Sequence, residues 1–187
     1  MTSALIVVDM QNAFIRPTGA LAVPDAATVV DAVNEHIVSA NEAGRPIFYT
    51  RDVAPTQLPQ GDPDRQTALH DDLLVRGTVV DKGPGKHGGF SGFVLSNAHS
   101  AGPGTGGLSD LAEHLRTADV DEVAVVGLAA DVCVAATARD ARRLGYRATI
   151  PLEATAFVHA HPGGDDAALT DLAAAGVSVG QGAHHAY

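Results

Sequence analysis

The stretch EVAVVGLAADVCV, residues 122–134, joins an apolar run to a helical pattern through a glycine. Residues 122–126 are mainly small or β-branched apolar residues, which predicts a buried strand. Asp131 is a candidate cap for a helix that ends at Leu144, so Cys133 would lie in the first turn of that helix. A strand, a turn and a helix in this order form the unit from which parallel α/β sheets are built.

The rest of the chain repeats this alternation. Apolar runs predict five further strands, at residues 4–8, 46–50, 78–80, 147–152 and 177–179. Helical patterns predict helices at residues 25–43, 108–115 and 165–175, the first of them capped by Asp25. Nearly unbroken apolar strands that alternate with helices predict an α/β fold, a doubly wound parallel sheet of six strands in three layers. We find no linker or repeat, which indicates one domain over residues 1–187 with a frayed tail from residue 180.

The composition is that of an ordinary globular chain with an acidic surface. Apolar residues make up 45% of the 187 residues, charged residues 18%, and the formal net charge is −10. An acidic surface repels nucleic acids and anionic membranes, so neither is an expected partner. A single cysteine permits no internal disulfide, and no stretch has the length of a membrane span or the basic flank of a signal peptide. We therefore expect a cytoplasmic protein.

Polar side chains follow four of the predicted strands, at the edge where parallel sheets bind their ligands. They are Asp9, Asp52, Lys82 and Cys133. A helix N-terminus favours a thiolate over a thiol, and its free N–H groups can hold an oxyanion. A carboxylate can move protons, and a nearby lysine favours both anions. A lone cysteine is more often a small buried apolar residue, so the spacing alone leaves catalysis and core packing both open.

The local sequences around these residues are more specific than their spacing. Three segments stand out: DMQNAF at residues 9–14, Lys82-Gly83 followed by FSGF at residues 90–93, and GLAADVCV at residues 127–134 followed by TARDA at residues 137–141. These segments resemble the isochorismatase-like cysteine hydrolases, and within that superfamily they are most similar to the nicotinamidases. The resemblance runs from about Ala4 to Val179 and implies the strand order 3-2-1-4-5-6.

The resemblance also implies roles for individual residues. Asp9, Lys82 and Cys133 match the family's acid/base, electrostatic partner and nucleophile. The peptide bond before Ala129 matches a cis bond of the family. This bond would aim the Ala129 N–H, together with the N–H of Cys133, at the oxyanion.

Four residues are candidates for contacts with the substrate: Phe14, Asp52, His87 and Phe90. Phe14 matches an aromatic wall of the family's substrate pocket. His87 and Phe90 lie in a segment expected to cover that pocket, although an exposed loop histidine is an equally good interpretation of His87. Asp52 follows the second predicted strand and could contact the substrate or a water, or cap a turn.

The sequence departs from the nicotinamidases at their metal site. These enzymes carry an Asp-x-His pattern after the second strand, with further histidines downstream, and these residues hold a divalent metal. Here Asp52 is present, but Ala54 stands where the histidine is expected, and the following loop offers only His70. A metal usually needs three or four protein ligands, so we expect no bound metal and no other cofactor. A divalent metal is expected only if the chain is a nicotinamidase. His159 and His161 could line a pocket rim or a subunit contact.

Several functions stay open at this point. The first is a cysteine-dependent amidohydrolase that cleaves a C–N amide bond of a small molecule through a thioester, without a metal. Its substrate would be a carboxamide, a ureido compound or a cyclic amide such as the lactam of a streptothricin-type antibiotic. A nicotinamidase with a divalent metal is the main alternative. Vinyl-ether hydrolysis of the isochorismatase type, which needs no cysteine nucleophile, and a catalytically silent binding protein are less favoured. The family also implies a homodimer or homotetramer.

Overall fold

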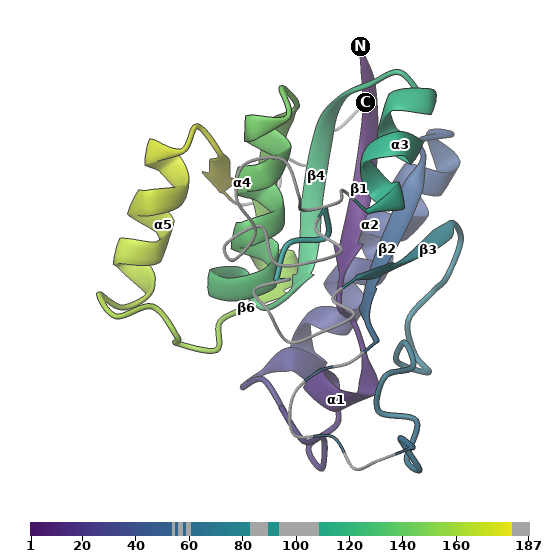
Figure 1. Ribbon diagram of the computed structural model, residues 1–187, viewed down its shortest axis with the longest axis vertical. Helices are drawn as coiled ribbons and strands as arrows, with labels where there is room; N and C mark the ends of the chain where they lie inside the picture. Colours follow the sequence, from purple (N-terminus) through teal and green to yellow (C-terminus); the bar gives the residue numbers. More distant parts are fainter. Residues whose placement is uncertain (54, 56–57, 59–60, 83–89, 94–108, 181–187) are drawn as a thin grey trace, which may run out of the picture.

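A computed structural model describes residues 1–53, 55, 58, 61–82, 90–93 and 109–180. A central parallel sheet carries helices on both faces (Figure 1). The strands are β1 (Thr2–Val8), β2 (Ile47–Asp52), β3 (Thr78–Lys82), β4 (Val120–Leu128), β5 (Arg147–Pro151), β6 (Thr155–Ala156) and β7 (Ser178–Gly180). The helices are α1 (Asn12–Ile15), α2 (Val30–Glu42), α3 (Asp110–Thr117), α4 (Ala135–Arg143) and α5 (Asp165–Ala174). Short 3₁₀ turns lie at Ala26–Val29 and Leu152–Ala154, and a π-helical turn lies at Ala130–Val134.

The strand order is β3-β2-β1-β4-β5-β7, which confirms the predicted order because β7 is the sixth predicted strand. The short strand β6 was not predicted. β5 pairs with β4 only along residues 122–124, and β6 takes its place farther along, beside Gly127 and Leu128. Gly180, with which the frayed tail was predicted to begin, is the last residue of β7, and residues 181–187 lie outside the described residues.

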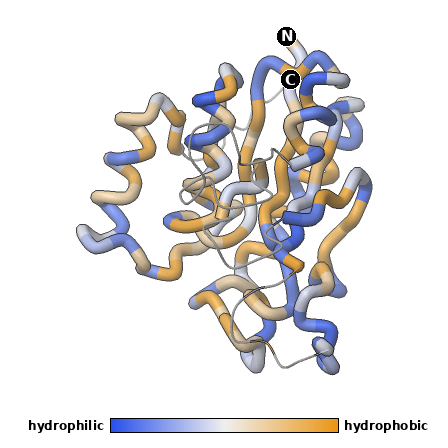
Figure 2. Tube along the Cα trace, in the orientation of Figure 1, coloured by the Kyte–Doolittle hydropathy of each residue, from blue (hydrophilic) through white to orange (hydrophobic). Residues whose placement is uncertain are grey.

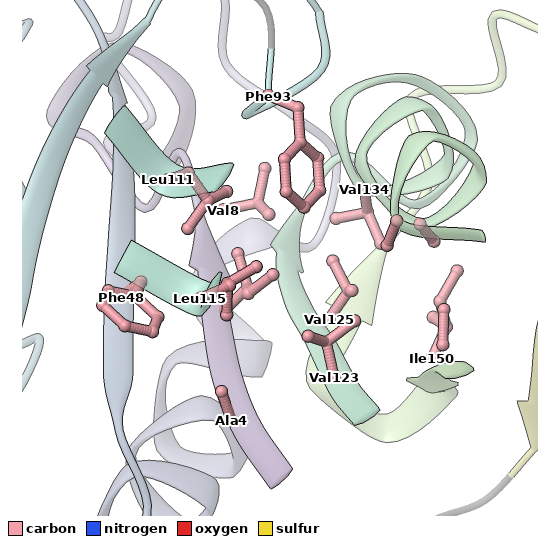
Figure 3. Packing of buried hydrophobic residues seen from close by; sticks show 14 of the residues in the cluster. Ala4, Val8, Phe48, Phe93, Leu111, Leu115, Val123, Val125, Val134 and Ile150 are labelled. Atoms are coloured by element: carbon pink, nitrogen blue, oxygen red, sulfur yellow. The ribbon is translucent and has the colours of Figure 1, made fainter. Parts of the chain in front are cut away.

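Both faces of the sheet are buried, as the nearly continuous hydrophobic strands in Figure 2 indicate. Residues of β1 alternate between two apolar clusters. Ile6 and Val8 belong to the cluster beneath α3, α4 and α5, where Figure 3 shows Leu111 and Leu115 of α3 packed against the sheet. Leu5 and Val7 belong to the cluster beneath α2. The predicted three-layer architecture is therefore confirmed.

One predicted helix cap is wrong. Asp25 precedes the 3₁₀ turn that leads into α2, but its backbone is left-handed, with φ of +57°, and its side chain makes no capping hydrogen bond. An N-cap residue normally has extended backbone, and only then does its side chain reach the first N–H groups of the helix. The left-handed backbone of Asp25 is not compatible with that geometry.

The ends of β1 and β4 approach each other closely at Gly127. This residue pairs with Val8 and has a φ of +107°, and a Cβ atom built on it would lie 2.2 Å from the Val8 carbonyl oxygen. Only glycine fits this position without displacing a strand. The close approach places Asp9, the residue after Val8, beside the turn that follows β4. The strand order reverses between β1 and β4, which is where open α/β sheets bind their ligands.

None of the helices within the described residues is both long and apolar enough to cross a membrane.

Candidate active site

Three of the predicted residues meet at the carboxyl ends of the strands. Asp9 follows β1, Lys82 ends β3, and Cys133 lies in the π-helical turn after β4. Lys82 reaches across the end of β2, so that its Nζ lies 2.7 Å from Asp9 Oδ2, and both side chains are almost completely buried. The Cys133 thiol is within hydrogen-bonding reach of Asp9 and Lys82. The structure therefore brings a thiol, a carboxylate and an ammonium group together.

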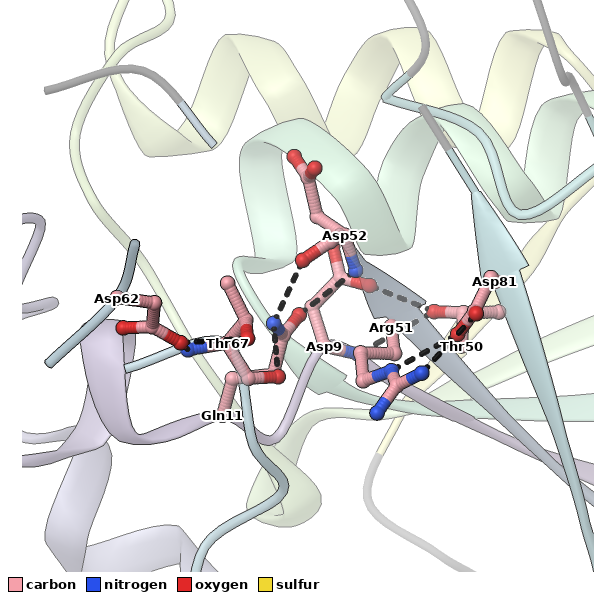
Figure 4. A network of polar contacts seen from close by, with 8 residues as sticks. All are labelled: Asp9, Gln11, Thr50, Arg51, Asp52, Asp62, Thr67 and Asp81. Atoms are coloured by element: carbon pink, nitrogen blue, oxygen red, sulfur yellow. Dashed lines mark hydrogen bonds and ion pairs between the residues drawn. The ribbon is translucent and has the colours of Figure 1, made fainter. Parts of the chain in front are cut away.

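Hydrogen bonds to Thr50 of β2 hold Asp9 in place (Figure 4). The Thr50 hydroxyl donates to Asp9 Oδ1 at 2.7 Å, and the Asp9 N–H donates to the Thr50 carbonyl at 3.1 Å. The Asp9 backbone is left-handed, with φ of +48°. One carboxylate oxygen is thus bound by Thr50, and the other faces Lys82. No role was predicted for Thr50, although this residue ends the apolar part of β2 beside Asp9.

We expect Thr50→Val to reduce kcat about tenfold and to leave KM within about twofold, because the buried Asp9 Oδ1 loses its hydrogen bond, a loss of about 1–3 kcal/mol. Thr50→Ser keeps the hydroxyl and is the matched control, with kcat expected close to that of the parent enzyme. Steady-state kinetics on an amide of the class predicted from the sequence would measure both variants. Equal losses of kcat in the serine and valine variants would contradict a positioning role for the hydroxyl.

The environment of Cys133 keeps its thiol protonated at neutral pH. Burial raises the pKa of the thiol to about 12. The Lys82 ammonium opposes this rise, and the Asp9 carboxylate adds to it. Burial alone would lower the pKa of Lys82, but Asp9 and Cys133 together raise it above its ordinary value. The position near a helix start favours a thiolate, but burial outweighs this effect and raises the pKa of the thiol, so its reaction requires a base in contact with it. The thiol is thus buried, although Cys133 as a whole residue is of intermediate exposure.

The turn that carries Cys133 folds back on one carbonyl group. The Ala129 carbonyl accepts the N–H groups of Val132 and Val134, both at 3.1 Å. The peptide bond between Leu128 and Ala129 is cis, as the resemblance implied. These bonds fix the course of the backbone on both sides of Cys133.

Asp131 has a different role from the predicted helix cap. Its carboxylate accepts the Val158 N–H at 3.0 Å and the Ala160 N–H at 2.6 Å, both from the segment after β6. Cys133 consequently lies in a π-helical turn, before the α-helix that begins at Ala135. The cap prediction failed because the carboxylate binds backbone N–H groups of a distant segment, and not those of its own helix. Asp131 thereby fastens that segment to the turn that carries Cys133.

A second set of hydrogen bonds joins the site to residues 90–93. Lys82 Nζ donates to the Phe90 carbonyl at 2.5 Å. The buried Thr137 hydroxyl donates to the Cys133 carbonyl at 2.7 Å and accepts the Gly92 N–H at 2.9 Å. Thr137 therefore links the turn that carries Cys133 to residues 90–93, a role that its position in the TARDA segment did not reveal.

The residues predicted to contact substrate differ in their burial, in their contacts and in whether the structure describes them. Phe14 lies on α1, is half-buried and packs against the apolar cluster beneath α2. Phe90 contributes its carbonyl to the site through Lys82, while its side chain is largely exposed. His87 lies outside the described residues. A substrate contact by any of these residues stays a prediction.

Gln11 fixes the position of Asp52 at the end of β2 (Figure 4). The Asp52 N–H donates to the side-chain oxygen of Gln11, and Gln11 Nε2 donates to the carbonyls of Asp52 and Thr67, each at 2.8 Å. Gln11 is fully buried, and its amide satisfies backbone groups of β2 and of the following loop. The sequence analysis quoted Gln11 in its motif but gave it no role.

The described residues do not form a metal-binding set. In this part of the chain, no three His, Cys, Asp or Glu side chains gather closely enough to hold an ion. His70 Nδ1 accepts the Asp72 N–H at 3.3 Å, which leaves it bound to its own loop. His159 and His161 pair with Asp165 and Asp171 at the surface.

Comparison with known proteins gives consistent matches along the chain. The profile of the family described as Isochorismatase domain matches residues 3–183. A streptothricin hydrolase of Streptomyces noursei is 35% identical, over 82% of this chain and 49% of the relative, so the chain spans about half the length of that protein. A nicotinamidase of Escherichia coli is 28% identical, over 94% of this chain and 93% of the relative.

Solved structures match over nearly the whole chain. A pyrazinamidase of Pyrococcus horikoshii in complex with zinc has a TM-score of 0.78 and 30% identity, over 97% of this chain and 100% of that one. An N-carbamoylsarcosine amidase of Thermoplasma acidophilum has a TM-score of 0.73 and 28% identity, over 97% of this chain and 96% of that one.

Proposed function

The chain belongs to the isochorismatase domain family, in which its relatives include hydrolases of amide C–N bonds, and we propose that it is a cysteine-dependent amidohydrolase of small molecules that works without a metal. The observation that carries the proposal is the contact between Cys133, Asp9 and Lys82 at the strand ends. A buried thiol with a raised pKa reacts only with a base beside it, and Asp9 is that base.

The first half of the reaction forms a thioester. Asp9 takes the proton of the Cys133 thiol, and the sulfur attacks the carbonyl carbon of the amide. The N–H groups of Ala129 and Cys133 hold the oxyanion, in the role that the family resemblance gives them. Asp9 then returns the proton to the amide nitrogen, the C–N bond breaks, and ammonia or an amine leaves. Lys82 keeps its charge beside Asp9 throughout and stabilises the carboxylate form.

The second half hydrolyses the thioester. Asp9 takes a proton from a water, and the resulting hydroxide attacks the thioester carbon. Collapse of this intermediate releases the carboxylic acid, and the sulfur leaves as a thiolate that recovers the proton from Asp9. The sum of both halves is one amide and one water converted into one acid and one amine.

The substrate is a carboxamide, a ureido compound or a cyclic amide of the streptothricin-lactam kind. The likeness to a streptothricin hydrolase supports the cyclic amide, and the likeness to nicotinamidases supports nicotinamide as the alternative. The metal-free proposal rests on Ala54 in place of a histidine and on the binding of His70 within its own loop. A thiol in contact with both buried charges favours this chemistry over vinyl-ether hydrolysis and over a catalytically silent protein.

The test is release of ammonia from nicotinamide, simple carboxamides and ureido compounds, with and without a chelator. Mass spectrometry of streptothricin-type lactams runs beside it and detects ring opening. We expect hydrolysis that resists the chelator. Turnover of nicotinamide that the chelator abolishes would instead establish the metal-dependent alternative.

The family resemblance leads us to propose a homodimer or homotetramer as well. Light scattering coupled to size-exclusion chromatography measures this directly, and a monomer at all accessible concentrations would contradict it.

A further inference from the structure

A pocket of about 220 Å³ lies between the residues that lead into α2 and the segment around β6. Its polar side chains are Asp25, Thr28, Thr155 and His159, and the remaining lining residues are apolar. These four side chains come from two segments far apart in sequence. The hydrogen bonds that they already make decide what the pocket can bind.

Both threonine hydroxyls have their single proton engaged. Thr28 Oγ1 donates to the Asp25 carbonyl at 2.7 Å, and Thr155 Oγ1 donates to the Gly127 carbonyl at 2.6 Å. A hydroxyl has one donor and two acceptor positions, so each oxygen can still accept a hydrogen bond but has no proton to offer a ligand.

One nitrogen of the His159 ring is also engaged in hydrogen bonds within the protein. Its Nδ1 lies 2.9 Å and 3.1 Å from the two carboxylate oxygens of Asp165. An ionised carboxylate only accepts, so Nδ1 carries a proton, and Nε2 is an acceptor whenever the ring is neutral. The ring also stacks on Phe157, with centroids 6.5 Å apart. Asp25 supplies a carboxylate, which has no donor.

We propose that this pocket binds an organic cation that carries N–H donors, such as a primary ammonium or a guanidinium group. With a neutral His159 ring, all four polar side chains can accept hydrogen bonds from a ligand, none has a free proton to donate, and one is an anion. Charge and hydrogen bonding thus select the same class of ligand, since donors on a cation make the stronger hydrogen bonds to a carboxylate. The net charge of −10 adds a favourable long-range field.

Backbone pairing connects the pocket to the π-helical turn that carries Cys133. Ala156 pairs with Leu128, the last residue of β4. Asp131 binds the N–H groups of Val158 and Ala160, which lie on either side of His159. A bound cation is therefore either a remote group of the substrate or a separate ligand that acts on the turn, and binding itself does not depend on the proposed reaction.

The backbone conformation at Asp25 and His159 limits the substitutions that can be used to test the site. Asp25 and His159 both have φ of +57°, a conformation that asparagine tolerates better than other non-glycine residues. Asp25→Asn removes the charge, and His159→Asn removes the imidazole, without new backbone strain. Asp119→Asn is the matched control, because Asp119 is exposed and has φ of +49°. It precedes the amino-terminal end of β4, whereas the pocket lies near the carboxyl end of that strand.

The probe is methylguanidinium chloride, titrated into the ¹⁵N-labelled chain and followed by the backbone amide resonances. We expect saturable shifts confined to residues 24–29 and 155–160. Asp25→Asn should weaken the apparent Kd about tenfold, since it replaces a charged acceptor by a neutral one. His159→Asn should weaken it severalfold, and Asp119→Asn should leave it unchanged. Tetramethylammonium, which has the same charge but no N–H donor, should give no saturable shift.

The proposal is overturned if methylguanidinium gives no saturable shift in this region, or if Asp25→Asn binds as well as the parent chain. Equal binding of tetramethylammonium would overturn the hydrogen-bond selectivity. Cys133→Ala should bind the probe normally, so a loss of the proposed reaction does not affect this result.

Kinetics then separate the two sources of the cation. If the substrate supplies it, Asp25→Asn raises KM for a cationic amide and not for a neutral one. If the ligand is separate, methylguanidinium changes the turnover of a neutral amide by the parent enzyme and not by the Asp25→Asn variant.

Discussion

Cys133→Ala is expected to lower kcat about 10⁴-fold or more, because the substitution removes the sulfur atom that we propose forms the thioester. Residual hydrolysis would come only from binding and from the oxyanion N–H groups. Cys133 is partly exposed, and alanine fits the turn without new contacts, so the melting temperature should stay close to that of the parent chain. Steady-state kinetics and thermal unfolding on the same preparation measure both quantities.

Rapid quenching followed by intact-mass spectrometry supplies a second readout. The parent enzyme should show an acyl adduct whose mass equals that of the substrate less its amine. The adduct should be missing from the Cys133→Ala variant. Substantial amidase activity in a folded Cys133→Ala variant would refute the assignment of the nucleophile.

Asp9→Asn is expected to lower kcat by about 10²–10⁴-fold. The same substitution is expected to lower the pKa of the Cys133 thiol, which by itself would increase the amount of reactive thiolate. The Asp9 charge contributes to the raised pKa of Cys133, and Lys82 opposes it. Removal of the carboxylate charge with Lys82 left in place therefore moves the pKa of the thiol downward from about 12. Turnover nevertheless fails, because no group remains to protonate the leaving amine or to activate water.

The rate of alkylation by iodoacetamide as a function of pH measures this pKa, since only the thiolate reacts. Its midpoint should move to lower pH in Asp9→Asn and stay unchanged in Asp119→Asn. Asparagine suits the left-handed backbone of Asp9. The substitution also leaves the buried Lys82 ammonium without its counter-ion, so thermal unfolding is measured on the same preparation to establish that the variant is folded. A midpoint that moves to higher pH, or a kcat equal to that of the parent enzyme, would contradict the role given to Asp9.

The sheet and the three central residues could be predicted because their signals are local. Apolar runs ended by Asp9 and Lys82, and a strand followed by the Cys133 turn, are visible in the sequence, and parallel strands bring such ends to one edge. The order of the strands came from the family resemblance. The two-residue strand β6 was missed because its pairing depends on the place that β5 leaves beside β4.

The supporting residues could not be predicted because their partners are distant in the chain. Asp131 binds a segment 27 residues away, and Thr50 binds Asp9 from 41 residues away. A carboxylate before a helix favours a cap in any local analysis, and only the folded chain presents the N–H groups that it binds here. The raised pKa of the Cys133 thiol could not be predicted either, since it comes from burial, and burial depends on how densely the surrounding segments pack.

The buried ion pair of Lys82 and Asp9 makes the active site a place of local instability. Removal of an ammonium and a carboxylate from water costs several kcal/mol for each ion, and their mutual attraction offsets only part of this cost. Two well-packed apolar side chains at these positions would stabilise the fold at least as well and would have no chemistry. Selection for activity therefore acts against selection for stability at these two residues. In relatives that have lost the activity, Asp9 and Lys82 should therefore be substituted earlier than the hydrophobic residues of β1 and β4 around them.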